Sequence, residues 1–257
     1  MPKNILKIPG SRLPTLSSDQ MREVDRMMLE DLGIDLLQMM ELAGYSLATL
    51  TQSLLGEKVH HGPILVLSGG GNNGGGGMTA ARHLRNRGAA VSVIFVGDTL
   101  RMKPAPLHQM RSLQAMGIDV EHWNGKGPDI LKQRISTATG IIDALVGYGL
   151  IQPPRGAIGR AIHAINSAGI PVFSLDVPSG FETTQGIILD PCVRATATLA
   201  LALPKSGLLS LQGRQVAGRV FVTDIGVPGL IYNRMGFIFK SPFMKETLIE
   251  VVDYKDP

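Results

Sequence analysis

The stretch Ser68-Gly-Gly-Gly-Asn-Asn-Gly-Gly-Gly-Gly-Met78 separates a short apolar run, residues 63–67, from a segment of helical composition that reaches Arg85. The predicted order is therefore strand, glycine-rich turn and helix. Glycine lacks a Cβ atom, so it reaches positive φ and lets backbone N–H groups approach a ligand. The helix that follows offers unpaired N–H groups and a partial positive charge. An anionic group, typically a phosphate, is the expected ligand.

The chain after this stretch alternates between strand and helix patterns. Strands are predicted at residues 64–67, 90–96, 118–121, 140–145 and 172–175, and helices near 75–87, 104–116, 128–136 and 157–168. Residues 196–203 and 219–224 are predicted to add further strands. This repetition predicts βαβ units with right-handed crossovers. We expect an α/β fold in a single domain, with a doubly wound, mostly parallel sheet and helices on both faces.

Two methionine-rich helices are predicted before the first strand. Ser17 is one of three adjacent N-cap candidates for a helix that ends at Gly33, and Asp35 can cap a second from Leu36 to about Leu55. Methionine fills irregular apolar gaps, so this pair is expected to pack on the sheet or on a second copy of the chain. We divide the chain into a loose leader (1–17), one domain (18–232) and a C-terminal extension (233–257) that is a tail or a short extra element.

The composition favours a soluble cytoplasmic protein. The net charge of +4 is small, and the Lys and Arg residues are scattered, which argues against a nucleic-acid groove. The single cysteine, Cys192, cannot form an internal disulfide, so a reducing compartment is expected. No run approaches about 18 consecutive apolar residues, the length that a membrane span needs. We therefore expect no nucleic-acid partner and no membrane association.

Three loops follow predicted strands, where doubly wound sheets bind their ligands. They are the glycine-rich stretch, the segment after Asp143, in which Gly147 leaves room for a ligand, and the turn that begins at Asp176. Two carboxylates in one cleft are unfavourable unless they are protonated, paired or bound to a cation. We therefore expect a cation there, shared with Asn73.

Other interpretations of these residues remain open. Gly69, Gly71 and Gly74 satisfy the GxGxxG pattern, and Asp98 follows the next predicted strand, so an NAD-dependent dehydrogenase is an alternative. Asp143 and Asp176 are equally suited to capping helices or turns. Lys205 could reach a phosphate, but we expect a solvated lysine.

The combination of these motifs resembles the YjeF N-terminal domain family. The resemblance covers about residues 18–230 in the family's order. It rests on eight stretches: Gln20-Met-Arg-Glu-Val-Asp25, Leu37-Gln-Met-Met-Glu-Leu-Ala-Gly44, Gly71-Asn-Asn-Gly-Gly75, Ala81-Arg-His-Leu84, Ile142-Asp-Ala-Leu145, Leu175-Asp-Val-Pro-Ser-Gly180, Lys205-Ser-Gly-Leu208 and Asp224-Ile-Gly-Val-Pro228. It implies a Rossmann-like fold, commonly in a homodimer. It also implies an epimerase that interconverts the R and S epimers of hydrated NAD(P)H (NADHX and NADPHX) in cofactor repair.

The resemblance also assigns site residues. Asn73, Asp143 and Ser179 match positions that hold a potassium ion, and all three offer oxygen donors, which a hard cation requires. Asp176 is our expected proton-transfer residue. The positions that match contacts to the hydrated dinucleotide are Asn72, Asn73, Gly74, Gly75, Gly76, Gly147, Tyr148, Gly149, Leu150, Ile151, Gln152, Pro153 and Asp176.

One departure from the family concerns the glycine-rich stretch. Where the family usually has Asn-Asn-Gly-Gly-Asp-Gly, this chain has Gly76 in place of the aspartate. A charged hydrogen bond to that aspartate would be worth about 1–3 kcal/mol. Two readings follow: an epimerase that tolerates Gly76, or a catalytically weak nucleotide- or protein-binding module of the same fold. We expect a separate dehydratase to act on the same pool of hydrated cofactor.

Overall fold

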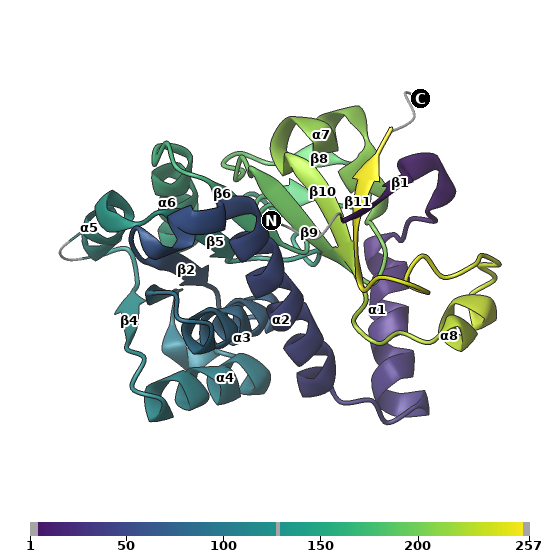
Figure 1. Cartoon of the computed structure of the whole chain (residues 1–257), viewed down its shortest axis with the longest axis horizontal. Helices are drawn as coiled ribbons and strands as arrows, with labels where there is room; N and C mark the ends of the chain where they lie inside the picture. Colours follow the sequence, from purple (N-terminus) through teal and green to yellow (C-terminus); the bar gives the residue numbers. More distant parts are fainter. Residues whose placement is uncertain (1–4, 127–128, 254–257) are drawn as a thin grey trace.

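One sheet of nine strands organises the computed structural model, which describes residues 5–126 and 129–253 (Figure 1). Its order is β1-β11-β10-β9-β6-β5-β2-β3-β4, and every neighbouring pair is parallel except β10 with β11. The strands are β1 (Leu6–Pro9), β2 (Ile64–Ser68), β3 (Val91–Val96), β4 (Val120–Trp123), β5 (Gly140–Ala144), β6 (Val172–Leu175), β9 (Ala197–Leu201), β10 (Arg219–Thr223) and β11 (Leu248–Val252). A separate hairpin joins β7 (Phe181–Glu182) and β8 (Ile187–Ile188).

The strand order places a topological switch between β2 and β5. From β2 the chain adds β3 and β4 on one side, then returns to add β5, β6, β9 and β10 on the other. This is the Rossmann-like, doubly wound arrangement, in which ligands bind outside the carboxyl ends of the strands at the switch point. The predicted fold class is confirmed, and the seven strands predicted between residues 64 and 224 match observed strands within two residues at each end.

Helices cover both faces of the sheet, as predicted. On one face α2 (Leu36–Leu55), α3 (Asn72–Asn86) and α4 (Pro104–Ala115) share a buried apolar core with strand residues that include Val66 and Val93. On the other face α5 (Ile130–Thr137) and α6 (Gly156–Asn166) pack with Leu65 and Ile94. The other α-helices of the described ranges are α1 (Ser18–Arg26), α7 (Leu211–Ala217) and α8 (Gly229–Arg234), and a π-helical turn η2 (Met27–Asp31) follows α1. Within the described ranges, no helix is both long and apolar enough to cross a membrane.

Both predicted N-caps of the methionine-rich helices are confirmed. The Ser17 side chain accepts a hydrogen bond from the backbone N–H of Gln20, whose side chain accepts from the N–H of Ser17 in return. Asp35 and Gln38 form the same reciprocal arrangement at the start of α2. The buried methionines of both helices pack with residues after β9 and β10, such as Leu203. Helix α1 and the first turns of α2 therefore lie at the carboxyl end of the sheet, and the rest of α2 packs on one face of it.

The predicted loose leader is wrong, because residues 6–9 form strand β1. β1 lies parallel to β11, with Leu6 opposite Ile249, and β11 pairs antiparallel with β10. The C-terminal extension thus supplies a short extra strand. β1 pairs with a strand at the opposite end of the chain, so this pairing cannot be read from neighbouring residues. Residues 1–4 and 254–257 of the two predicted segments lie outside the described residues.

The glycine-rich stretch is only partly a turn. Helix α3 begins at Asn72, so Gly74 and its three successors are helical, and no glycine between residues 69 and 77 has a positive φ. The expected use of positive φ is therefore wrong, and close packing is the reason for glycine. A Cβ atom on Gly74 would lie 1.8 Å from the carbonyl oxygen of Gly69, and one on Gly77 would lie 2.4 Å from Cβ of Ala144. The glycines let α3 pack directly on the strand ends.

Candidate functional site

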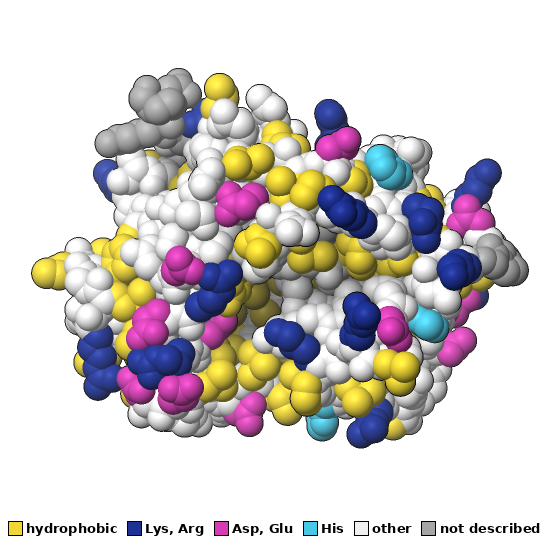
Figure 2. Space-filling view, turned by 180° about the vertical axis from the view of Figure 1, so that it is seen from behind, with side chains coloured by type: hydrophobic (Ala, Val, Ile, Leu, Met, Phe, Trp, Pro, Cys, Tyr) yellow, Lys and Arg dark blue, Asp and Glu magenta, His cyan; other side chains and the backbone are white. Residues whose placement is uncertain are grey.

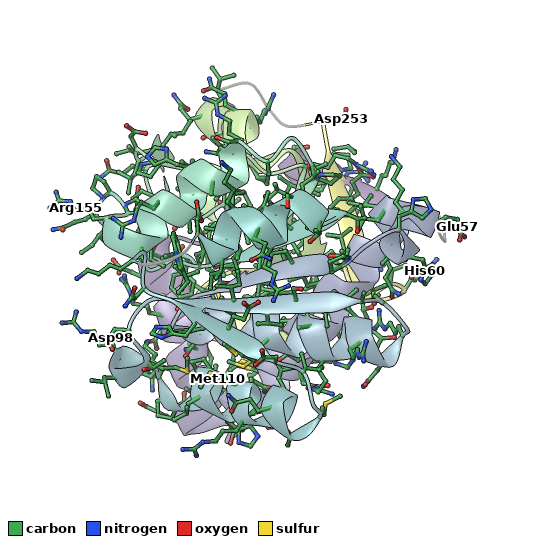
Figure 3. All side chains as sticks on the ribbon, turned by 90° about the vertical axis from the view of Figure 1, so that its left-hand side faces the viewer. Glu57, His60, Asp98, Met110, Arg155 and Asp253 are labelled. Atoms are coloured by element: carbon green, nitrogen blue, oxygen red, sulfur yellow. The ribbon has the colours of Figure 1, made fainter. Side chains whose placement is uncertain are left out.

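A cavity of about 740 Å³ lies at the carboxyl end of the sheet, at the switch between β2 and β5. Figure 2 shows a hollow on this face, with apolar side chains around it and Lys or Arg side chains at its border. In the side view of Figure 3, Asp98 and Arg155 lie at this end of the sheet, and Glu57 and His60 lie at the other. Seven residues of the predicted site line the cavity: Asn72, Asn73, Gly76, Gly147, Tyr148, Gly149 and Asp176.

The other predicted substrate contacts do not line this cavity. Gly74 and Gly75 are buried inside α3, where a Cβ on Gly75 would meet the Met40 side chain at 2.7 Å. The segment after Gly149 leads away toward α6, and Ile151 is 75% exposed. A role in substrate binding stays a prediction for these residues: Gly74, Gly75, Leu150, Ile151, Gln152 and Pro153.

Asp176 is held in the cavity wall by two partners. It follows β6 with a φ of 68°, a strained conformation for a residue other than glycine, and only 3% of it is exposed. One carboxylate oxygen pairs with the ammonium group of Lys205, and the other accepts a hydrogen bond from the N–H of Tyr148 at 3.2 Å. Backbone strain and buried charge at one residue are typical of functional sites.

Lys205 is a correction to the sequence-based expectation of a solvated lysine. Its side chain is fully buried, and besides Asp176 it donates to the carbonyl oxygen of Leu201 at 3.0 Å. Its environment comes from β6 and β9, which lie side by side in the sheet but are distant in sequence. Local sequence context could not reveal this ion pair.

Asp143 and Ser179 are brought together, as predicted. Asp143 is fully buried, and its carboxylate accepts hydrogen bonds from the hydroxyls of Ser174 and Ser179 and from the N–H groups of Leu145 and Ser179, at 2.6–3.3 Å. Burial raises the pKa of Asp143, and these hydrogen bonds act in the opposite direction. The Asp143 carboxyl group is therefore fully hydrogen-bonded within the protein and anchors the loop after β5.

The predicted third metal ligand, Asn73, lies against the same loop. A Cβ on Gly147 would be 3.3 Å from the Asn73 amide carbon, and the N–H of Val146 donates to the Ser179 hydroxyl at 2.9 Å. The amide nitrogen of Asn73 is buried and has no hydrogen-bond partner among the described residues. A 180° turn of this amide would put its oxygen in the same place, and an amide oxygen is a ligand that suits a hard cation.

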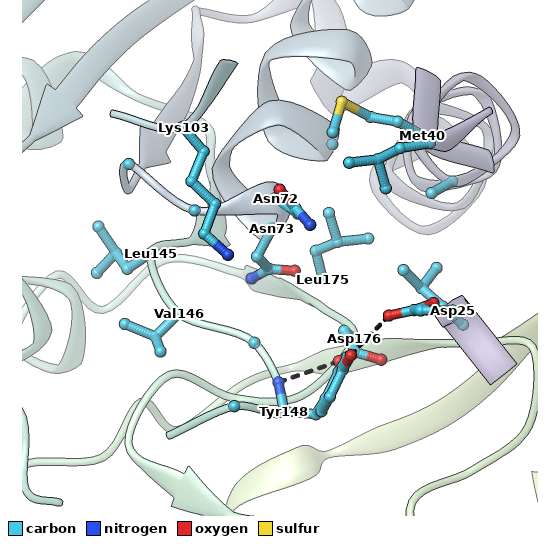
Figure 4. Close-up of a pocket in the computed structure, with 18 of the residues that line it drawn as sticks. Asp25, Met40, Asn72, Asn73, Lys103, Leu145, Val146, Tyr148, Leu175 and Asp176 are labelled. Carbon is cyan, nitrogen blue, oxygen red and sulfur yellow. Dashed lines mark hydrogen bonds between the residues drawn. The ribbon is translucent and has the colours of Figure 1, made fainter. Parts of the chain in front are cut away.

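The first turn of α3 and its neighbours suit an anion. Gly71 precedes the helix without a side-chain cap, so its first N–H groups are free of a competing side-chain oxygen. Lys103 donates its backbone N–H to Gly70 at 2.9 Å, and its side chain extends toward Asn73 (Figure 4). Arg101 also lines the cavity. Lys103 and Arg101 were not identified as site residues from the sequence, because it is the tertiary structure that brings their segment next to the start of α3.

Asp25 is a second carboxyl group of the cavity that the sequence interpretation missed. It lies on α1 and accepts a hydrogen bond from the Tyr148 hydroxyl at 2.6 Å. Burial raises the pKa of Asp25. The sequence did contain a signal for Asp25. Met21, Asp25 and Met28 recur at the spacing of one helix face, the two methionines are buried, and a carboxyl group on a buried face is unusual.

Comparisons with known proteins agree with this geometry. A family model described as YjeF-related protein N-terminus matches residues 36–207. The NAD(P)H-hydrate epimerase of Dehalogenimonas lykanthroporepellens is 37% identical over 94% of this chain and 94% of the relative. The bifunctional NAD(P)H-hydrate repair enzyme Nnr of Thermofilum pendens is 34% identical over 81% of this chain and 39% of the relative. A yeast protein of known crystal structure has the same fold, with a TM-score of 0.81 and 23% identity over 93% of this chain and 100% of the yeast chain.

Proposed function

Because this chain belongs to the family of the YjeF-related protein N-terminus, we propose that it is an NAD(P)H-hydrate epimerase. It is an isomerase that interconverts the R and S epimers of hydrated NADH or NADPH. The observation that carries this function is the buried Asp176–Lys205 pair in the wall of a cavity of about 740 Å³. Cavities of about 300–1,000 Å³ are typical of sites for small molecules and cofactors.

The reaction requires the carbon that bears the added hydroxyl group to lose and regain its configuration. Loss of hydroxide to an iminium-like species and opening of the ring are the two routes, and both need a positioned proton donor and acceptor. Lys205 and the Tyr148 N–H hold the Asp176 carboxylate at the cavity wall, where it can accept and return a proton. Asp176 is therefore the proposed proton-transfer residue.

The dinucleotide phosphates are assigned to the start of α3. The free N–H groups after Gly71, together with Lys103 and Arg101 at the rim, provide hydrogen-bond donors and positive charge. Apolar side chains that include Phe95 and Leu175 line other parts of the cavity and suit the faces of the rings. NADHX and NADPHX are both proposed as substrates.

A potassium ion is proposed beside this site, held by Asn73, Asp143 and Ser179. It would supply a fixed positive charge at the loop that carries Gly147. The chemistry of the donors supports it, since carboxylate, hydroxyl and amide oxygens suit hard cations. In the part of the chain that the structure describes, no cluster of three or more His, Cys, Asp or Glu side chains could hold a metal, so no site of that kind competes.

The setting of the enzyme is also a proposal. The single cysteine supports a cytoplasmic location. The half-exposed apolar side chains of Leu42 and Tyr45 on α2 support a homodimer. A separate dehydratase would act on the same pool of hydrated cofactor, in keeping with the relative named as a bifunctional repair enzyme.

Exchange between the two purified epimers, followed by NMR with and without the protein, tests this function. We expect the protein to accelerate exchange in both directions. The alternative is a catalytically weak binding module, favoured by Gly76 in place of the family's usual aspartate. Dinucleotide binding without any acceleration of exchange would reject the epimerase and support the module.

A further inference from the structure

We propose that Asp25 is the second proton-transfer residue of this cavity and works as a pair with Asp176. This inference rests on the proposed epimerase function. The inference adds one residue of α1 to the catalytic site. Helix α1 lies outside the sheet and reaches the cavity through its packing at the strand ends.

Tyr148 links the two carboxyl groups. Its hydroxyl donates to Asp25 at 2.6 Å, and its backbone N–H donates to Asp176 at 3.2 Å (Figure 4). The carbonyl oxygen of Tyr148 accepts from the Ser18 hydroxyl at 3.2 Å, so α1 holds this residue at two points. Asp25 and Asp176 both line the cavity. One ligand could therefore contact both.

The charges around the two carboxyl groups differ. Asp176 has Lys205 in direct contact. Asp25 contacts the neutral Tyr148 hydroxyl, and the charges of Lys205 and Asp176 lie farther away. Its other cavity neighbours are Arg22 on the same helix and the apolar Met39 and Ala43 of α2. Burial and Asp176 raise the pKa of Asp25 more than Tyr148 and Lys205 lower it. Burial and the negative charges also raise the pKa of Tyr148, so its phenol stays a donor at neutral pH.

Two carboxyl groups in unlike environments are a common arrangement for acid–base chemistry. In one direction the proton of Asp25 moves to the hydroxyl oxygen of the hydrated nicotinamide. The carbon–oxygen bond breaks, its electron pair leaves with water, and the ring nitrogen lone pair forms a C=N⁺ bond. Water then adds to the same carbon, the C=N⁺ electrons return to nitrogen, and Asp176 accepts the released proton. In the reverse direction the two residues exchange roles, so the pair carries one proton.

Asp25→Asn separates proton transfer from positioning. The Asn carbonyl oxygen can still accept the Tyr148 hydrogen bond, but the amide cannot exchange a proton with the substrate. We expect kcat for epimer exchange to fall by about 10²–10⁴-fold, with KM nearly unchanged. In the wild type we expect kcat to fall at high pH, because the proton shared by Asp25 and Asp176 is lost. This fall in the pH–rate profile should be absent in Asp25→Asn. Asp25→Glu should recover part of kcat.

Glu23→Gln is the matched control on the same helix. Glu23 forms an exposed pair with Arg26, and neither lines the cavity, so kcat and its pH profile should stay at wild-type values. Equal urea midpoints for the two variants would show that both are folded. A kcat for Asp25→Asn within a few-fold of wild type, with an unchanged pH profile, would overturn the role of Asp25. An inactive wild-type protein would instead reject the epimerase function itself.

Discussion

The ammonium group of Lys205 and the carboxylate of Asp176 form an ion pair that is buried at the carboxyl end of the sheet. A buried pair rarely adds stability, because removing two charges from water costs about as much as their attraction returns. Asp176 adds backbone strain at a φ of 68°. The buried ion pair and the strained backbone both lie in one wall of the cavity, and unfavourable features of this kind are typical of catalytic sites.

Lys205→Met should destabilise the protein and lower its activity. The substitution leaves Asp176 buried without its cation, so we expect the free energy of unfolding to fall by about 3–5 kcal/mol. Urea unfolding measures this change. Adding Asp176→Asn to Lys205→Met should recover a large part of it, because the double variant buries no unpaired charge. If the changes in unfolding free energy of the two single variants simply added up in the double variant, Lys205 and Asp176 would not be coupled.

Asp176→Asn should lower epimer exchange by about 10²–10⁴-fold while the fold survives. Asparagine tolerates positive φ better than most residues, so the backbone at this position can be retained. Steady-state kinetics with a purified epimer measure the loss. Asp119→Asn, at an exposed position before β4, is the control and should behave as wild type. Near-normal turnover by Asp176→Asn would remove this residue from the mechanism.

Gly74→Ala should destabilise the protein, whereas Gly71→Ala should not. The new Cβ at residue 74 would lie 1.8 Å from a backbone oxygen of Gly69, but at residue 71 no atom lies within 4 Å. Overpacking of this kind costs about 1–3 kcal/mol or more. Urea unfolding of the two variants makes the comparison. Equal stabilities would contradict the close packing of α3 on the strand ends.

Gly76→Asp should fold and change kcat by less than about tenfold, or 1.4 kcal/mol. The new Cβ would meet only the end of the Leu175 side chain, at 2.6 Å, and that side chain can move. Asp25 and Asp176 already supply two carboxyl groups to the cavity. Gly76→Ala controls for the Cβ alone. An inactive wild-type protein that gains turnover only with Gly76→Asp would show that the missing aspartate is essential.

Potassium should raise the melting temperature more than choline chloride at equal ionic strength. A ligand that binds only the folded state adds about 2.7 kcal/mol at a concentration of 100 Kd. Ser179→Ala removes one proposed oxygen ligand and should abolish the difference between the two salts. Thermal unfolding in both salts tests this. An identical melting temperature for the wild type in both would argue against the site at Asn73, Asp143 and Ser179.

Local patterns were enough for most of the fold. Apolar runs that alternate with helical segments located β2 to β6, β9 and β10, and side-chain caps at Ser17 and Asp35 located the first two helices. These signals depend on residues within a few positions of one another. The rule that ligands bind at the carboxyl ends of parallel strands then placed the glycine-rich stretch, Asp143 and Asp176 at one end of the sheet.

The sequence by itself determined the doubly wound sheet and the placement of the three loops at the carboxyl ends of its strands, because strand, helix and cap preferences are local. Only the tertiary structure decided the pairing of β1 with β11, the burial of Lys205 against Asp176, and the contact of Asp25 with Tyr148. Each of these joins segments that are distant along the chain. Their energies come from packing and desolvation, which depend on the assembled neighbours and leave no local pattern.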